Sequence, residues 1–211
     1  MDLREWEPLY EEILSDFGFS RSDDESSARL LKALMQNADL IDDDEIRITG
    51  SVVVVGPASP SLDGIGDRTV IAAGSAMSVL ESIGVRPDIL VTDLDGDIVP
   101  QIEASKDGVI TFIHAHGDNS GRIMDHAKEF TGPVVLTTQS VPDNVIRNYG
   151  GFTDGDRAVC IAFELGADEV KLRGFDFDRP VGKDGSDPSV KAKKLKWARR
   201  IIDTFGSRVR L

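Results

Sequence analysis

Acidic side chains able to hold a cation follow one of the short apolar runs of this 211-residue chain. Asp93 and Asp95 flank Leu94, directly after the run 88–92. In an extended segment both carboxylates lie on one face and Leu94 on the other. Convergent carboxylates repel each other unless a hard cation sits between them, and Mg²⁺ binds through one or two carboxylates with phosphate oxygens and water. The spacing favours a Mg²⁺ site over an acidic turn, for which Asp and Gly are also preferred.

A second polar cluster, 114–119, contains the pattern His-x-His-x-Asp. This pattern occurs in zinc hydrolases, but His126 and Cys160 are the only further histidine and cysteine. They are too few for a dinuclear zinc centre. We therefore expect His114 and His116 to contact substrate or phosphate. Asp118 and Asn119 are candidates both for the site and for capping the helix that follows.

A third cluster, 150–157, opens a predicted helix. Thr153 and Asp156 have the spacing of a capping box, and acids in a first turn suit the helix dipole. Asp154 and Asp156 are thus candidates for a cap and for a ligand site alike. Two adjacent glycines, which allow close backbone approach to a ligand, and Arg157 favour a site. Later in the chain, Lys183 and the basic last helix could supply positive charge to a polyphosphate, although a solvated face is the favoured interpretation for most of these residues.

The apolar runs alternate with helical patterns, which predicts a doubly wound, mostly parallel α/β sheet. The expected strands are 51–55, 69–73, 88–92, 109–113, 133–138 and 169–173, and the expected helices are 75–84, 99–106, 119–131, 157–166 and 189–205. The carboxyl ends of parallel strands share one edge, so the polar clusters should converge on one crevice. The candidate catalytic residues are Asp93, Asp95, Asp118, Asp154 and Arg157. The candidate ligand-binding residues are Ser59, Ser61, Gly74, Ser75, His114, His116, Asn119, Thr138, Gln139, Asp156 and Lys183, with Asp176 as a weaker candidate for a polar ring edge.

Residues 1–48 read as an acidic helical subdomain in front of an α/β catalytic domain, 49–211. The N-terminal subdomain could serve equally as a lid or as a dimer interface. Asp23, Asp24 and the acidic run 42–44 lie outside every motif, so we expect them on a hydrated surface.

Composition excludes some classes of protein. The formal net charge of −13 argues against general nucleic-acid binding. No stretch approaches the roughly 20 apolar residues of a membrane span, and the N-terminus does not resemble a signal peptide. The single cysteine favours a reducing cytoplasm. Asp outnumbers Glu by 26 to 11 and Lys occurs 9 times, which hints at a salt-rich habitat.

The clusters, in this order, resemble the archaeal 6-hydroxymethyl-7,8-dihydropterin pyrophosphokinases, whose fold is similar to the catalytic domain of thiamine pyrophosphokinase. The resemblance rests on the segments 87–88, 92–96, 114–119, 137–139, 150–158 and 174–177. It implies transfer of diphosphate from ATP to the hydroxymethyl group of a reduced pterin, with Mg²⁺ and release of AMP. The product would enter a folate- or methanopterin-type cofactor.

Two positions depart from the pattern of that family. Pro57 and Ser59 stand where glycines precede Pro-Ser-Leu, and Gly74 stands where the family has an aspartate. The first alternative is a haloacid-dehalogenase-type phosphatase with Asp93 as nucleophile and Asp95 as acid, although Asp97 replaces its usual threonine. The second alternative, motivated by the departures, is a non-catalytic nucleotide-binding domain.

Overall fold

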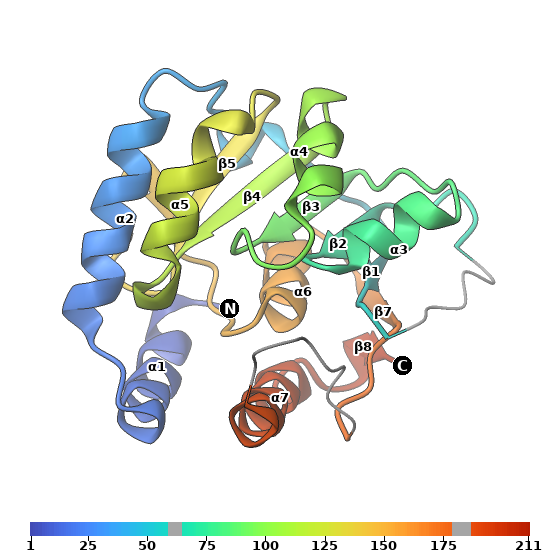
Figure 1. Cartoon of the computed structure of the whole chain (residues 1–211). Helices are drawn as coiled ribbons and strands as arrows, with labels where there is room; N and C mark the ends of the chain where they lie inside the picture. The colour runs from blue at the N-terminus through green and yellow to red at the C-terminus, as the bar shows by residue number, and fades with distance from the viewer. Residues whose placement is uncertain (59–64, 179–186) are drawn as a thin grey trace.

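A parallel β-sheet forms the centre of the molecule (Figure 1). The structure, a computed structural model, describes residues 1–58, 65–178 and 187–211, and the candidates Ser59, Ser61 and Lys183 lie outside these ranges. Within the described residues the sheet has eight strands in the order β6-β5-β4-β3-β2-β1-β7-β8, and all neighbouring pairs are parallel. The strands are β1 (Ser51–Val55), β2 (Val70–Ala73), β3 (Ile89–Thr92), β4 (Ile110–Ala115), β5 (Val134–Thr138), β6 (Ile146–Arg147), β7 (Glu169–Arg173) and β8 (Val209–Arg210).

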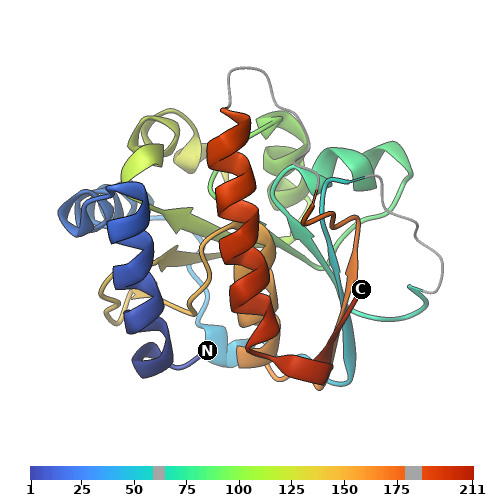
Figure 2. The same ribbon diagram turned by 90° about the horizontal axis from the view of Figure 1, so that it is seen from below.

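Helices cover both faces of the sheet (Figures 1 and 2). The helices are α1 (Leu3–Phe17), α2 (Arg21–Met35), α3 (Ala76–Ser82), α4 (Ile98–Lys106), α5 (Ser120–His126), α6 (Asp154–Glu164) and α7 (Pro188–Asp203). One apolar core contains buried residues of α1, α6 and α7, and the other contains buried residues of α2, α3, α4 and α5. Along β1, Val52 and Val54 belong to the first core, whereas Val53 and Val55 belong to the second. Alternate side chains of a strand thus fill opposite layers, as the pleat requires.

The direction of the crossovers explains this division. Helices α3, α4 and α5 connect strands that step from β2 towards β5, whereas α6 and α7 lead to β7 and β8 on the other side of β1. Right-handed crossovers that step in opposite directions must cover opposite faces. Strands β1 and β7 are neighbours, but the chain leaves them in opposite directions, towards β2 and towards β8. Ligands bind in open α/β sheets at the carboxyl ends of two such strands.

The predicted fold class is confirmed, and each expected strand and helix is present with shifted boundaries. The largest shift concerns the helix expected over 119–131, which is α5 followed by a 3-10 helix, Ala127–Glu129. Helix α6 begins at Asp154, three residues before the expected start, because the capping box of Thr153 and Asp156 forms. Strands β6 and β8 were not predicted. Each has two residues, too few for a periodic apolar pattern.

The N-terminal segment 1–48 packs on both layers. Trp6, Tyr10 and Ile13 of α1 are fully buried in the core shared with α6 and α7, and Leu31 of α2 is fully buried in the other core. Because α1 and α2 pack on opposite faces, the segment that joins these two helices crosses from one face of the sheet to the other. Within the described residues, no helix combines the length and apolarity that crossing a bilayer requires.

Candidate active site

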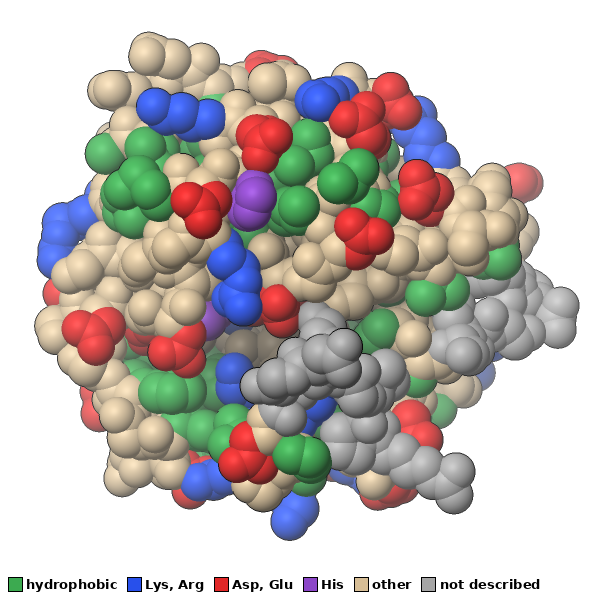
Figure 3. Space-filling model, in the orientation of Figure 1, with side chains coloured by type: hydrophobic (Ala, Val, Ile, Leu, Met, Phe, Trp, Pro, Cys, Tyr) green, Lys and Arg blue, Asp and Glu red, His purple; other side chains and the backbone are tan. Residues whose placement is uncertain are grey.

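A cavity of about 560 Å³ lies at the carboxyl edge of the sheet. Loops after six strands line it: Pro57 and Ala58 after β1, Ser75 after β2, Asp93 and Asp95 after β3, 116–118 after β4, Gln139 after β5, and 174–177 after β7. The walls are completed by 18–20 with Asp23 and Asp24, by 152–155, and by Lys191, Lys194 and Leu195. Figure 3 shows a hollow on this face with acidic, basic and histidine side chains around it.

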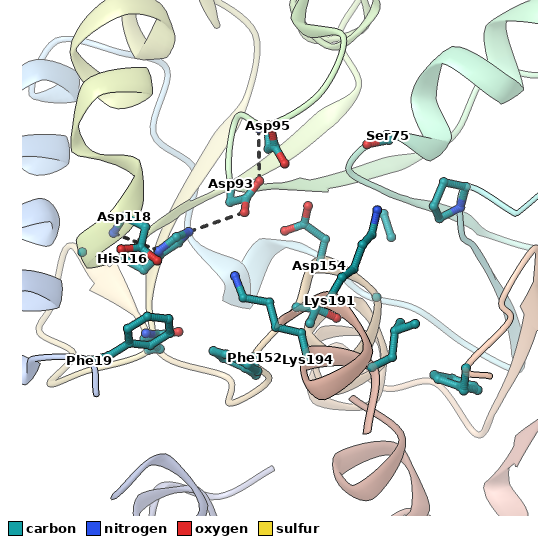
Figure 4. A pocket seen from close by; sticks show the side chains of 18 of the residues that line it. Phe19, Ser75, Asp93, Asp95, His116, Asp118, Phe152, Asp154, Lys191 and Lys194 are labelled. Carbon is teal, nitrogen blue, oxygen red and sulfur yellow. Dashed lines mark hydrogen bonds and ion pairs between the residues drawn. The ribbon is translucent and has the colours of Figure 1, made fainter. Parts of the chain in front are cut away.

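Asp93 points into the cavity from the end of β3 (Figure 4). Its Oδ2 lies 3.4 Å from His116 Nε2, and its Oδ1 accepts the Asp95 N–H at 3.1 Å. Burial alone would raise the pKa of Asp93, but the hydrogen bond and charge of His116, with the charge of Arg157, hold that pKa well below its usual range. The carboxylate is therefore ionised at neutral pH, as a cation ligand must be.

Leu94 adopts a left-handed conformation with φ 65°, and its side chain is buried. The extended alternation expected for 93–95 is therefore wrong, because β3 ends at Thr92 and the chain turns there. Both carboxylates nevertheless line the cavity. Asp95 also pairs with Arg122 of α5 at 3.3 Å. A non-glycine residue at positive φ stores strain, which is typical of residues held for a functional geometry.

The loop after β4 is fixed by hydrogen bonds of its own side chains. His116 Nδ1 accepts the Asp118 N–H at 3.2 Å, so the proton of a neutral ring lies on Nε2, towards Asp93. Asn119 Nδ2 donates to the Asp93 and His114 carbonyls at 2.9 and 2.7 Å. Asn119 thus joins the ends of β3 and β4 beneath the cavity and does not line it.

His114 is buried below the cavity wall, with Nδ1 3.0 Å from the Thr137 hydroxyl. Burial first, and then the charges of Arg157 and His116, lower its pKa well below the usual value. His114 is therefore a neutral supporting residue in the structure, whereas His116 faces the cavity. Thr138 is also buried and accepts the Ser140 N–H at 3.2 Å. Of the candidates on β5, Gln139 is the one that reaches the cavity.

Asp154 enters the cavity from the first turn of α6, and its carboxylate faces Asp93 (Figure 4). Arg157 Nη1 lies 3.2 Å from Asp154 Oδ1, while Arg157 Nη2 donates to the Phe152 carbonyl at 3.1 Å. Arg157 is almost fully buried and outside the cavity lining, so its place is behind Asp154. Gly74 has φ 50°, and a Cβ there would overlap the Asp154 carboxylate. The Asp154 carboxylate fills the space that a side chain at position 74 would need.

Asp156 lies in the cap of α6, away from the cavity. Its Oδ2 accepts the Phe152 N–H at 2.6 Å and its Oδ1 accepts the Thr153 N–H at 2.9 Å. Complete burial raises its pKa, although these donors and the charge of Arg157 act in the opposite direction. The geometry corresponds to the capping alternative of the sequence pattern.

Two cavity lysines come from the basic last helix, most of whose basic residues the sequence pattern assigned to a solvated face. Lys191 and Lys194 point from α7 into the cavity (Figure 4). The Lys194 Nζ also lies 5.6 Å from the centroid of the Phe152 ring. In the sequence, Lys191 and Lys194 stand at i, i+3 spacing within a lysine-rich stretch. The same pattern occurs on a solvated helix face, so only the position of α7 over the cavity distinguishes the two.

Helix α2 supplies a buried acid that the sequence placed on the surface. Asp24 is 2% exposed, so the expectation of a hydrated position is wrong. Its Oδ1 accepts the Gly117 N–H at 2.7 Å, and its Oδ2 accepts from Tyr10 Oη at 2.5 Å and Gln139 Nε2 at 2.8 Å. Because α2 packs against the loops after β4 and β5, its first turn becomes part of the cavity wall.

The cavity thus brings together these sequence candidates: Asp93, Asp95, Asp118, Asp154, Ser75, His116, Gln139 and the weaker candidate Asp176. No group of three or more His, Cys, Asp or Glu side chains in the described ranges converges as a complete metal cage would. Mg²⁺ needs no such cage, because it keeps waters and takes phosphate oxygens beside one or two carboxylates. The ionised Asp93, with Asp95 next to it, fits that donor set.

Comparison with known proteins finds a family model and three relatives whose descriptions agree with one another. The family model described as 6-hydroxymethylpterin diphosphokinase MptE-like matches residues 28–181. A 6-hydroxymethyl-7,8-dihydropterin pyrophosphokinase of Pyrococcus furiosus is 42% identical over 96% of this chain and 94% of its own length. Proteins of the same name from Methanothermobacter thermautotrophicus and Methanocaldococcus jannaschii are 38% and 32% identical, over 96% and 100% of this chain and 94% and 98% of their own lengths.

The fold is also similar to that of a solved structure. It is the Maf glycosyltransferase from Magnetospirillum magneticum AMB-1, with a TM-score of 0.55 and 16% identity. The similarity covers 90% of this chain but 36% of that chain, so this chain corresponds to about a third of that protein. At this identity the likeness concerns the fold alone.

Proposed function

The chain belongs to the 6-hydroxymethylpterin diphosphokinase MptE-like family, and from that premise we propose that it transfers diphosphate from ATP to 6-hydroxymethyl-7,8-dihydropterin, with Mg²⁺. The membership agrees with the resemblance seen in the order of the motifs. The observation that carries the proposal is the centre of the cavity, where Asp93, Asp95 and Asp154 meet Lys191 and Lys194 of α7. Carboxylates that hold a cation, together with ammonium groups, are what a polyphosphate requires.

The reaction is a substitution at phosphorus. The hydroxymethyl oxygen of the pterin forms a bond to the β-phosphorus of ATP, the bond from that phosphorus to the bridging oxygen of the α-phosphate breaks, and AMP leaves. The hydroxyl proton is released. Such reactions depend mostly on positioning and on stabilising charge on the phosphate oxygens, and less on covalent participation of the protein.

The residues divide this work by position. Asp93 and Asp95 would hold Mg²⁺, which would neutralise charge on the phosphate oxygens when bound. His116 and Asn119 fix Asp93, while Arg157 fixes Asp154 across the cavity. Lys191 and Lys194 would supply further positive charge to the phosphates, the role that the sequence gave to Arg157 and Lys183. Without positive charge the carboxylates would repel the phosphates, since both are negative. The cation and the two lysines would therefore act together to offset this repulsion.

The product would be the diphosphate of a reduced pterin, an activated intermediate for a folate- or methanopterin-type cofactor. The names of the relatives favour this reaction over the phosphatase alternative. The phosphatase would place phosphate covalently on Asp93 and form no AMP.

The test is direct. The protein is incubated with ATP, Mg²⁺ and 6-hydroxymethyl-7,8-dihydropterin, and nucleotides and pterins are separated by chromatography. We expect AMP and pterin diphosphate in equal amounts, and no product in the presence of EDTA. ADP with pterin monophosphate, inorganic phosphate without AMP, or activity unaffected by EDTA would each contradict the proposal.

A further inference from the structure

The cavity spans a row of neighbouring strand ends. Lining residues follow β5, β4, β3, β2, β1 and β7, which are consecutive in the sheet. With strands roughly 4.8 Å apart, the five intervals correspond to about 24 Å. The charged residues Asp93, Asp95 and Asp154 lie in the middle of this row, and Ser75 lies beside them (Figure 4). The reacting phosphates therefore belong in the middle, with one ring system towards each end.

The end near β5 and β4 has a built polar wall. We call it the α2 end, formed by Phe19, Asp24, Gly117, Gln139 and Phe152. The Phe19 and Phe152 rings have centroids 6.5 Å apart and make its apolar side. Asp24 and Gln139, 2% and 3% exposed, make its polar side. A buried polar pair next to aromatic rings is the composition of a site for a flat heterocycle with hydrogen-bonding edges.

The Asp24 carboxylate determines which way the Gln139 amide faces. A carboxylate only accepts hydrogen bonds, so Gln139 must present Nε2 to Asp24 Oδ2 at 2.8 Å. The amide oxygen Oε1 is thereby turned away from Asp24. It has two lone pairs, of which the neighbouring His114 ring engages at most one, so the other can accept from a ligand in the cavity that Gln139 lines. Trp6 Nε1 donates to the Gln139 backbone carbonyl at 2.9 Å and fixes the main chain at the same point.

The opposite end differs in its polar groups. Phe175 and Phe177, with ring centroids 5.9 Å apart, line it together with Pro57 and Ala58. The acid at this end, Asp176, is exposed and accepts the Asp178 N–H at 3.0 Å. It offers a solvated acceptor, whereas the acceptors of the α2 end are buried. Hydrogen bonds discriminate between ligands most strongly where unpaired partners are desolvated.

We propose that the pterin ring binds at the α2 end, and that Asp24 is a positioning residue that orients Gln139 to accept from the ring. This assignment rests on the proposed function. The 2-amino and N3–H groups of a pterin are adjacent donors on one edge, so they require acceptors such as the Gln139 oxygen. The nucleotide then extends from the charged middle towards Phe175 and Phe177. Residues 18–24, in the segment that leads into the α/β domain, thereby determine which acceptor alcohol is used.

The test measures binding of each substrate separately. Asp24→Asn replaces one of the two acceptor oxygens by an NH2 group. That group faces either Gln139 Nε2, so that Gln139 must turn its oxygen towards position 24, or the Gly117 N–H of the same α2 end. The reduced pterin should then bind about ten- to a hundredfold more weakly, whereas the Kd of Mg-ATP stays within about threefold. Gln139→Met, which keeps chain length but removes the amide, should give the same split. Phe177→Ala should weaken Mg-ATP binding and leave pterin binding unchanged.

Tyr10→Phe is the structural control. It removes one donor to the same carboxylate but leaves the bond to Gln139 intact, so it should lower Tm and keep pterin affinity. Mg-ATP binding weakened more than pterin binding in Asp24→Asn and Gln139→Met would overturn the assignment, as would an equal loss of both. Equal loss of pterin affinity in Tyr10→Phe would reduce Asp24 to a structural role. Turnover by the unaltered protein separates the two hypotheses, because absence of pterin diphosphate there rejects the proposed function itself.

Discussion

At the scale of single residues, the position of the Asp93 carboxylate depends on two neighbours in the loop after β4. His116 contacts its side chain and Asn119 holds its backbone carbonyl. Asp93→Asn removes a charge and keeps these shapes, so the fold should persist while cation binding is lost. We expect kcat to fall by about a thousandfold or more for Asp93→Asn, and by a comparable factor for Asp95→Asn. Steady-state rates and circular dichroism measure the two effects, and near-normal turnover with Mg²⁺ as the sole metal would reject the cation assignment.

Gly74 is the residue that lets Asp154 approach the site. A Cβ at this position would overlap the Asp154 carboxylate, and φ 50° disfavours any side chain. Gly74→Ala should therefore displace Asp154 and lower kcat by at least about tenfold, while destabilising the protein by about 1–2 kcal/mol.

The matched control is Gly84→Ala. Gly84 has φ 68° but nothing within 4 Å of its Cβ position, so the substitution carries the backbone strain without the overlap. It should lower the free energy of unfolding by about 1 kcal/mol and leave kcat unchanged. Equal kinetic effects of the two alanines would mean that strain, and not the place of Asp154, limits activity.

Residues after predicted strands were predictable from sequence, and residues that depend on packing between distant elements were not. Asp93, His116 and Asp154 follow β3, β4 and the turn before α6, and the shared edge of a parallel sheet brings them together. Asp24 carried no comparable signal, because a polar residue in an acidic helix is usually solvated. Its burial results from Tyr10 and Gln139, which are 14 and 115 residues away in sequence.

At the scale of elements, α2 is joined to the loop after β5 by an ion pair between Lys32 and Asp143. The hydrogen bond from Lys32, opposed by partial burial and aided by two backbone N–H groups, lowers the pKa of Asp143 from 3.8 to about 2. A carboxyl with a depressed folded-state pKa stabilises the fold above its unfolded pKa, and this contribution is lost as pH falls through the folded value.

Asp143→Asn should therefore destabilise the protein at pH 7. This difference in the free energy of unfolding should shrink as pH falls from 3.8 towards about 2 and vanish below that value. Since both side chains are about a third exposed, the difference should be below about 1 kcal/mol. Urea unfolding at several pH values from about 1 to 7 measures it. Lys32→Met should weaken the pH dependence of the free energy of unfolding over the same pH range. A difference between wild type and Asp143→Asn that persists below pH 2 would contradict the ion-pair account.

The element boundaries show where local sequence is sufficient. The strand patterns placed β1 and β7 without error. Strand β1 is a continuous run of valines after Ser51, as in buried strands of a parallel sheet, whereas β7 alternates the buried Val170 and Leu172 with partly exposed charged residues. Helix α7 was predicted from its apolar stripe, but its contact with α1 was not predictable. That contact consists of Arg200 with Glu12 and Lys193 with Asp16, pairs that are more than 170 residues apart.

At the scale of the whole molecule, the pattern of apolar runs determined the sheet and its helical layers, because each strand and helix carries its own periodicity. The position of the first 48 residues was left open between a lid and a dimer interface. The structure packs α1 and α2 on opposite layers and makes the loop between them part of the cavity wall. Long-range packing of this kind has no local pattern, since many surfaces of a helix pair could bury the same apolar stripe.

Charge is distributed unevenly over the whole chain and makes stability depend on salt. Residues 1–50 carry 14 acids and 5 bases, whereas 181–211 carry 3 acids and 9 bases. The two segments attract each other through the ion pairs of α1 with α7, which stabilise only weakly because their side chains are exposed. The net charge of −13 remains, and its self-repulsion destabilises the compact state.

We therefore expect Tm to rise between about 0.01 and 1 M KCl, as the Debye length falls from about 30 to 3 Å. Screening weakens attraction and repulsion alike, but the acids exceed the bases by 13, so the loss of repulsion is the larger effect. Thermal unfolding followed by circular dichroism measures the shift. Sucrose acts by exclusion without screening charge, so it separates the electrostatic effect from general stabilisation of compact states. A Tm that falls with KCl would show that the α1–α7 ion pairs outweigh the excess acidity.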